Sequence, residues 1–159
     1  METATESRIR VPEIPRISRE IDTIIVHCSA TPEGANFNAS DIDRWHRKPP
    51  FNFRCIGYHY VVLLDGTIER GRRIKEVGAH CVGHNKHSIG VCYIGGVRKD
   101  GHTADDTRTE PQKEALVALL KALKKRFPTA KIRGHRDFSS KDCPSFDATK
   151  EYSFLTDNQ

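Results

Sequence analysis

The chain has 159 residues, of which 36% are hydrophobic and 30% are charged, and its formal net charge is +5. This length and composition are typical of one globular domain with a buried core and exclude a disordered chain. No apolar run is long enough to cross a bilayer, and no apolar segment follows a basic start as in a signal peptide. We therefore expect a protein that is made and folded in a cytoplasm, without membrane insertion.

Neither the cysteines nor the charge assigns a function. The five cysteines are an odd number and contain no CxxC pair, so we expect free thiols and no disulfide framework. The positive charge fits an anionic partner, either nucleic acid or a bacterial wall polymer, and it fits equally well a basic surface without a dedicated partner.

The first third of the chain predicts a leader, a strand and a helix. Residues 1–20 carry many charges without a period and predict a flexible leader or a surface strap, followed by one folded domain over 21–155. The β-branched run at 22–30 predicts a strand buried on both faces. A short helix is predicted over 40–48, with Ser40 as its N-cap and two prolines after its end.

A hairpin and a second buried strand follow. The hairpin is predicted over 57–72, with its turn at the Asp-Gly pair 65–66. The run at 87–96 predicts another buried strand, and 97–109 is a polar loop.

The last third predicts a long helix and a short strand. Thr109 and Gln112 have the spacing of a capping box for a helix over 110–127. A strand is predicted at 130–135, and a turn or short helix at 148–154. Strands that alternate with helices, together with one hairpin, predict an α/β single domain with a central mixed β-sheet flanked by helices.

Three separated residues offer a metal site. His27 and His135 end predicted strands, and Cys143 follows His135 by eight residues in a polar turn. Two imidazoles and a thiolate leave the fourth position of a tetrahedral zinc open, as catalytic zinc requires. However, a single histidine is more often a hydrogen-bonding or solvated residue, and a single cysteine is more often a small buried hydrophobe. The spacing alone leaves both interpretations open.

Four segments resemble, in order, the signature blocks of the zinc-dependent N-acetylmuramoyl-L-alanine amidases, the family of the T-odd phage lysozymes and the peptidoglycan recognition proteins. The segments are VHCSAT (26–31), GYHYVVLLDGTIERGR (57–72), VGAHCVGHNKHSIGVCYIGG (77–96) and GHRDFSSKDCPSFD (134–147). The resemblance spans about residues 21 to 150 and is greatest to the phage lysozyme branch.

The resemblance implies an activity, a cofactor and a set of site residues. It implies hydrolysis of the amide between N-acetylmuramic acid and L-alanine, with peptidoglycan or a muropeptide as substrate and Zn²⁺ as cofactor. The metal ligands are then His27, His135 and Cys143. Tyr58 is then the active-site tyrosine, and Lys141 is the catalytic lysine that stabilises the oxyanion.

The resemblance also implies that His80 contacts the substrate, while the roles of His84, His87 and Cys81 stay open. His46 and His102 are expected to be solvated.

Strand alternation gives a prediction for the neighbours of two site residues. It places Tyr58 and Tyr60 on one face of the sheet and His59 on the other, and it turns Cys28 away from His27. His59 and Cys28 are therefore interpreted as core residues.

Several alternatives remain at this point. The chain fits a non-catalytic muropeptide-binding module, or a metal-independent hydrolase with a Cys143–His135 pair. A nucleic-acid binder is not favoured, because the sequence has no basic stripe interleaved with aromatic residues. We expect a monomeric endolysin of phage or prophage type that reaches the cell wall after release or assisted export. A cytoplasmic muropeptide-recycling amidase is the other setting that fits.

Overall fold

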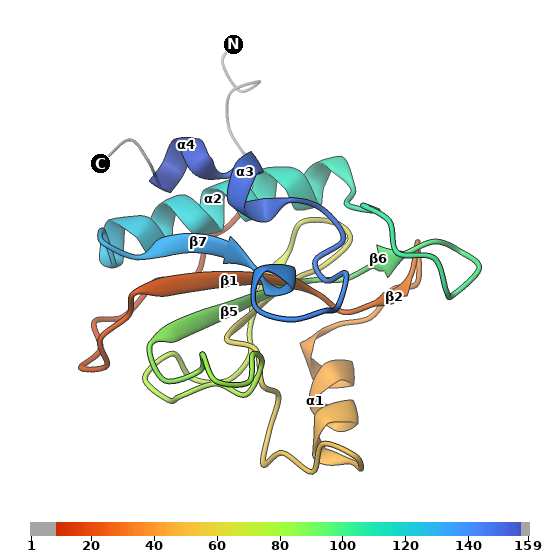
Figure 1. Ribbon diagram of the computed structural model, residues 1–159, viewed down its shortest axis with the longest axis horizontal. Coiled ribbons are helices and arrows are strands. Elements are labelled where there is room, and N and C mark those ends of the chain that lie inside the picture. The colour runs from red at the N-terminus through yellow and green to blue at the C-terminus, as the bar shows by residue number, and fades with distance from the viewer. Residues whose placement is uncertain (1–8, 157–159) are drawn as a thin grey trace.

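The structure is a computed structural model that describes residues 9–156. Its centre is a five-stranded sheet in the order β4-β3-β5-β1-β7, of which Figure 1 labels β5, β1 and β7. β3, β5, β1 and β7 run parallel, and β4 is antiparallel to β3. The strands are β1 (Thr23–Cys28), β3 (Tyr60–Val62), β4 (Ile68–Arg70), β5 (Ser88–Tyr93) and β7 (Lys131–Gly134). The predicted hairpin, the two predicted buried strands and the predicted short last strand are confirmed.

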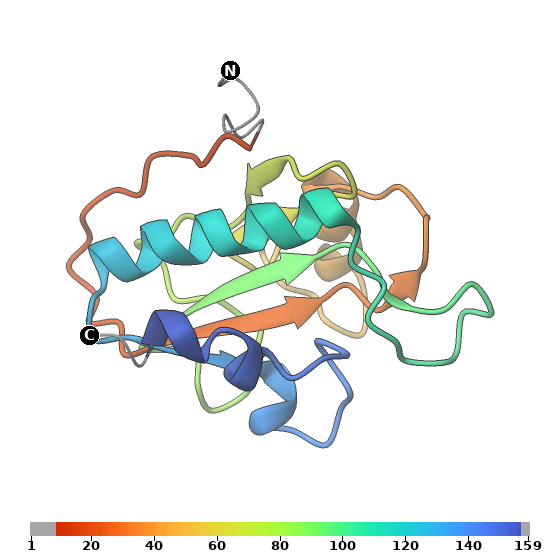
Figure 2. The same ribbon diagram turned by 90° about the horizontal axis from the view of Figure 1, so that it is seen from above.

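Helices cover both faces of the sheet. The long helix α2 (Glu110–Arg126) lies across one face, and α1 (Ala39–Arg47) lies on the other side (Figures 1 and 2). The short helices α3 (Ala148–Glu151) and α4 (Ser153–Thr156) pack beside β7 and α2. A two-stranded parallel sheet that the sequence did not predict joins β2 (Thr31–Pro32) to β6 (Gly96–Val97). The predicted fold class, a mixed sheet flanked by helices, is confirmed.

Strand alternation in β1 separates core from site. Ile24, Val26 and Cys28 are buried in the large apolar cluster beneath α2. Because successive side chains of a strand point to opposite faces, His27 emerges on the α1 side. That side holds a smaller cluster in which Ile42 of α1 packs with sheet residues such as Val61 and Cys92. The interpretation of Cys28 as a core residue is therefore correct.

The helix starts show how local polar residues set boundaries. Thr109 and Gln112 form the predicted reciprocal capping box at the start of α2. At α1 the N-cap is Asn38 and not the predicted Ser40. Asn38 accepts a bond from the Asp41 backbone N–H, and the Asp41 carboxylate accepts one from the Asn38 N–H. This pair satisfies two free backbone donors, which explains why the helix begins before Ser40.

The prediction for Tyr58 and Tyr60 is wrong, because β3 begins only at Tyr60. Tyr60 packs in the cluster under α2, whereas Tyr58 packs in the cluster on the α1 side. Tyr58 precedes the regular strand, so its side chain does not follow the two-residue alternation. His59 is 1% exposed, accepts a hydrogen bond from the Gly90 N–H at its Nδ1, and bonds the Glu76 carbonyl through Nε2. It is a core residue, as interpreted.

The described part of the leader, residues 9–20, lies along the surface. Ile14 is buried there, and the Arg126 guanidinium of α2 donates two hydrogen bonds to its carbonyl. Residues 1–8 of the predicted leader lie outside the described part of the chain. Within residues 9–156, none of the helices combines the length and apolarity that a membrane span requires.

Candidate metal centre

Two histidines meet at the carboxyl ends of β1 and β7. These strands are parallel neighbours in which Val26 pairs with Gly134, so the following residues, His27 and His135, leave the sheet side by side. Their ring centroids are 4.5 Å apart. The carboxyl edge of parallel strands is the usual location of ligand sites in such sheets.

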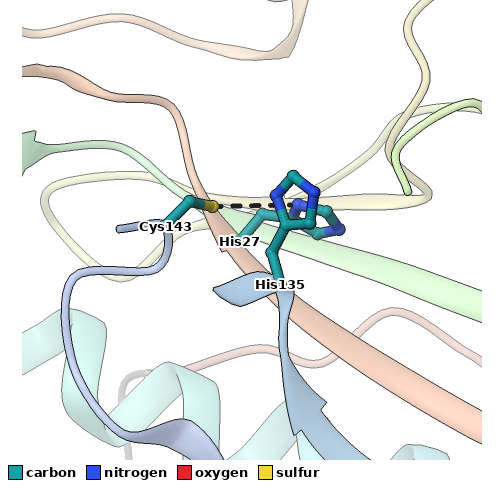
Figure 3. Close-up of side chains that lie close together, drawn as sticks. All are labelled: His27, His135 and Cys143. Carbon is teal, nitrogen blue, oxygen red and sulfur yellow. Dashed lines mark hydrogen bonds between the residues drawn. The ribbon is translucent and has the colours of Figure 1, made fainter. Parts of the chain in front are cut away.

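Cys143 approaches the same point from the loop after β7 (Figure 3). Its Sγ lies 3.8 Å from Nδ1 of His27. The Cys28 backbone N–H donates a hydrogen bond of 3.1 Å to this sulfur. A backbone donor at this distance stabilises the thiolate, the form in which cysteine binds metals.

The two residues after Cys143 attach its loop to the strands. The Tyr93 hydroxyl at the end of β5 donates a 2.7 Å bond to the Pro144 carbonyl. The Ser145 hydroxyl donates a 2.8 Å bond to the carbonyl of Gly96 in β6. These bonds fix the loop so that the thiol faces the two imidazoles.

The donor set fits a zinc ion. One ligand atom from each of His27, His135 and Cys143 lies within 4.8 Å of the others. Zinc binds imidazole nitrogen at about 2.0–2.1 Å and thiolate sulfur at about 2.3 Å, which places tetrahedral donors roughly 3.5 Å apart. The sulfur–nitrogen distance of 3.8 Å is close to that value. Two nitrogens and one sulfur are also donors that zinc prefers, whereas magnesium and calcium prefer oxygen.

The protonation states favour a cation at this point. Burial lowers the pKa of His27 and His135, so both imidazoles are neutral and able to ligate near pH 7. The neighbouring Cys28 thiol and burial raise the pKa of the Cys143 thiol. Ionisation of Cys143 therefore needs a positive charge nearby.

The His80 ring is hydrogen-bonded to His27 and does not point toward solvent. Its Nδ1 lies 2.8 Å from Nε2 of His27, and its Nε2 lies 3.3 Å from the Ser88 hydroxyl. The ring fits because residue 90 is glycine: a Cβ there would approach ring atoms of His80 to 2.7 Å. Protein groups therefore contact both ring nitrogens, and the substrate contact of His80 stays a prediction. No sequence pattern indicated this pair, since 53 positions separate the two histidines.

Tyr58 packs against His27, and the charge of Lys141 acts on both site histidines. The ring of Tyr58 is 5.0 Å from that of His27. Burial raises the pKa of Tyr58 well above its usual value, so its hydroxyl keeps its proton. Lys141 is exposed, and after burial its charge is a further cause of the lowered pKa of His27 and His135. The structure thus brings both residues to the site.

The expectation for His46 is wrong. It is 9% exposed, and its Nδ1 accepts a 2.9 Å bond from the Gly57 N–H. Its ring centroid lies 5.4 Å from that of Tyr58, so the His46 ring packs against the tyrosine. The signal was present in the sequence, because His46 is four residues after Ile42 and shares its buried helix face. His102 is exposed, as expected.

Comparison with known proteins decides the family. A family model described as N-acetylmuramoyl-L-alanine amidase matches residues 17–146. The chain belongs to this amidase family. It is similar to the endolysin of Escherichia phage T7, with 40% identity over 126 residues, covering 79% of this chain and 82% of that protein. The endolysin of Enterobacteria phage T3 is 39% identical over 133 residues, covering 84% and 85%.

A solved structure agrees with the fold of the amidase. An endolysin amidase, LysCS from Clostridium intestinale, superposes with a TM-score of 0.72 and 25% identity, covering 90% of this chain and 89% of that one. The family and the relation to phage lysozymes that the sequence indicated are confirmed. The protein is an enzyme that hydrolyses the amide between N-acetylmuramic acid and L-alanine in peptidoglycan. The roles of individual residues stay predictions.

Proposed function

We propose that this amidase is a zinc-dependent endolysin whose metal ligands are His27, His135 and Cys143. One observation carries the proposal: two imidazoles and a thiol from three separate segments bring their ligand atoms within 4.8 Å at the carboxyl edge of the sheet. The endolysins among the relatives support the biological role. A bound zinc supplies a Lewis acid that activates a water molecule and polarises the scissile carbonyl.

Lys141 stabilises the negative charge that develops on the carbonyl oxygen during attack on the amide. It lies two residues before Cys143, and its charge acts on both site histidines. An ammonium group fixed near a developing oxyanion lowers the barrier because it needs no reorganisation during the reaction. Its exposure allows the side chain to reach a substrate in the open part of the site.

Tyr58 holds a proton at its hydroxyl. Because burial raises its pKa, the group is a neutral donor throughout the working pH range. The leaving group of the reaction is the amine of L-alanine, which must gain a proton when the amide breaks. We assign Tyr58 to orient the attacking water and to pass a proton toward this amine.

His80 orients His27. For His27 to ligate through Nδ1, its proton must be on Nε2, which then donates to Nδ1 of His80. His80 in turn carries its proton on Nε2 and donates to the Ser88 hydroxyl, which donates to the Asn85 carbonyl. A partner on the second ring nitrogen fixes both the tautomer and the direction of a ligand histidine.

The proposed catalytic unit is residues 21–155, with residues 1–20 as a leader. We propose that it acts as a monomer on the cell wall after release from the cytoplasm in which it is made. The relatives named endolysins support action on the wall. Nucleic acid is not a proposed partner.

Metal analysis together with product identification tests the proposal. We expect one zinc per chain, and release of free L-alanine amino groups from purified sacculi that stops with a strong chelator and returns with zinc. Activity that survives the chelator but is lost to a thiol alkylator would favour the Cys143–His135 hydrolase. Binding of muropeptide without any release would favour the non-catalytic module.

A further inference from the structure

A second cleft, separate from the metal centre, lies between the leader and the edge of the sheet. One wall is leader residues 13–16, and the other is the end of β4 with the segment 70–75. Its volume is about 500 Å³, and its lining shares no residue with the metal ligands. The Arg70 guanidinium donates a 3.1 Å bond to the Glu13 carbonyl and so ties the two walls together.

The lining of this cleft is strongly basic. Arg16, Arg73 and Lys75 are exposed, and their side chains have no ion pair or hydrogen bond within residues 9–156. Glu13 is the one carboxylate among the lining residues, and in the same described range it forms no ion pair. Positive charges therefore outnumber the single carboxylate among the lining residues, and the Glu76 carboxylate next to them interacts with Arg72 and Arg73.

A buried arginine adds a fixed positive charge. Arg72 is 8% exposed, and its guanidinium donates only to backbone carbonyls, those of Cys55, Ile56 and Val77. Buried charges in proteins are normally paired with an opposite charge. Carbonyl partners hold the guanidinium in place without cancelling its charge, so Arg72 adds a fixed positive charge to the lining of the cleft.

A buried hydroxyl without a partner lies at the same cleft. Tyr60 lines it and is 2% exposed, yet within the described chain its hydroxyl makes no hydrogen bond. Burial raises the pKa of Tyr60 to about 12, while the nearby Arg70 charge opposes the rise, so the group is a neutral donor close to Arg70. Buried polar groups are almost always satisfied, and an exception indicates a water molecule, an ion or a ligand.

We propose that this cleft binds a phosphate group, with Arg70, Arg73 and Lys75 as its cationic partners and the Tyr60 hydroxyl as a neutral donor. Several converging cations favour a ligand that is a tetrahedral oxyanion of high charge over a ligand with a single carboxylate. The phosphate has two possible sources: free phosphate, or a phosphate-bearing polymer of the cell envelope that would hold the enzyme near its substrate. The site is independent of the catalytic role proposed for the metal centre.

Titration of the full chain with inorganic pyrophosphate tests the proposal. Calorimetry at low salt would compare R73A/K75A with K121A/K125A, which also removes two positive charges, but from exposed positions of α2. We expect the dissociation constant to rise at least roughly tenfold in R73A/K75A and to change less than about twofold in K121A/K125A. The reason is that a charge-assisted hydrogen bond forms only where the charged group reaches the ligand. Equal losses in both variants, or no binding to the unaltered chain, would overturn the proposal.

Tyr60→Phe separates the hydroxyl from the charges. Because that hydroxyl has no partner in the described chain, we expect an unchanged melting temperature and a roughly three- to tenfold weaker pyrophosphate affinity. Unaltered affinity in this variant would contradict the assignment of Tyr60 to the site.

Sacculi distinguish the two phosphate sources. Retention would be measured on sacculi that carry phosphate polymers and on sacculi stripped of phosphodiesters by hydrofluoric acid. If retention falls on stripping, and if R73A/K75A lowers retention only on the untreated sacculi, the ligand is the envelope polymer. If neither the stripping nor the substitutions change retention, the ligand is free phosphate. Hydrolysis of a soluble muropeptide should be the same for R73A/K75A and the unaltered chain, so a failed phosphate site and a failed amidase assignment give different results.

Discussion

The two faces of the sheet bury different chemistry. Beneath α2 the interior is mostly apolar, and its buried polar side chains are partnered: Gln112 and Lys124 each donate to two backbone carbonyls, and Arg108 pairs with two carboxylates. On the α1 side three imidazoles, those of His27, His46 and His59, are nearly inaccessible to solvent. One face thus supplies the apolar burial that stabilises the fold, whereas the other holds groups that are costly to bury.

The hydrogen bonds of these rings show which buried histidine is available to bind a metal. His46 and His59 each accept a backbone N–H at Nδ1. Within residues 9–156 the His27 ring has no backbone partner: Nε2 bonds His80 and Nδ1 faces the thiol of Cys143. The first two rings are structural because their lone pairs are used by the backbone. In His27 the nitrogen that faces Cys143 and His135 is free to ligate a metal.

Cys143→Ala should have the largest effect on the site side of this comparison. Removal of one of three ligands leaves too few donors for a stable zinc site, so we expect loss of zinc retention and of all lytic activity. Zinc content after dialysis and turbidity loss of sacculi measure the two properties, and His27→Ala should behave the same way.

Cys55→Ser is the matched control for Cys143→Ala. Cys55 is a free cysteine whose thiol donates to the Ile56 carbonyl, outside the metal centre. It should keep one zinc per chain and full activity. If Cys143→Ala retained zinc and lysis, the proposed ligand set would be wrong.

Leu120→Ala perturbs the opposite face. Leu120 is fully buried in the cluster beneath α2. We expect the free energy of unfolding to fall by about 2–5 kcal/mol from lost burial and the cavity that remains. Denaturant unfolding measures it, and the zinc affinity of the folded variant should not change. A large loss of zinc affinity would show that packing beneath α2 and metal binding on the α1 side are energetically coupled.

Lys141→Ala tests chemistry without removing a ligand. We expect zinc to stay bound while the turnover number falls about 100-fold, since one stabilising group for the oxyanion is lost. Turnover of a soluble muropeptide and zinc content are measured on the same sample. Lys99→Ala is the control and should be fully active, because Lys99 is an exposed loop residue that is not among the proposed site residues. A fully active Lys141→Ala enzyme would remove Lys141 from the mechanism.

The apolar face was the predictable one. The periodicity of α2, its capping box and the apolar runs of β1 and β5 depend on neighbours in sequence, and each of these elements was predicted. The two-residue strands β2 and β6 were missed, since so short a pair has no period of its own. The alternation rule failed at Tyr58 because the regular strand starts two residues later.

The site was predictable only in part. The family resemblance pointed to the residues that the structure brings together, but spacing alone left His27, His135 and Cys143 open to other roles. The link between His27 and His80 was not predictable, because it depends on the packing of a loop against Gly90. Contacts between distant segments are set by tertiary packing, which local sequence patterns do not encode.

His80→Phe tests that link. The ring is replaced at similar size, but the acceptor for His27 Nε2–H is lost, so we expect zinc affinity to fall about 10- to 100-fold. Competition with a chromophoric chelator measures the affinity without reference to activity. ¹⁵N chemical shifts of His27 would report loss of the single tautomer. Exposed His84, which stacks on Phe138, provides the control, and His84→Ala should leave both readouts unchanged. An unchanged affinity in His80→Phe would leave His80 with the substrate-contact role alone.

The smallest effect expected is a pH dependence of metal affinity. The pKa of His27 and His135 is lowered chiefly by burial, so both rings are already neutral at pH 7 and release no proton when they ligate. The pKa of Cys143 is raised, so its thiol is protonated and must release one. Zinc affinity should therefore rise about tenfold per pH unit above neutrality, with one proton released per ion bound. Calorimetry in buffers of different ionisation enthalpy counts that proton. A zinc-bound water can lose a further proton near pH 7. Once that proton is allowed for, release of more than one would mean that an imidazole is charged before ligation, as in an ordinary solvated histidine.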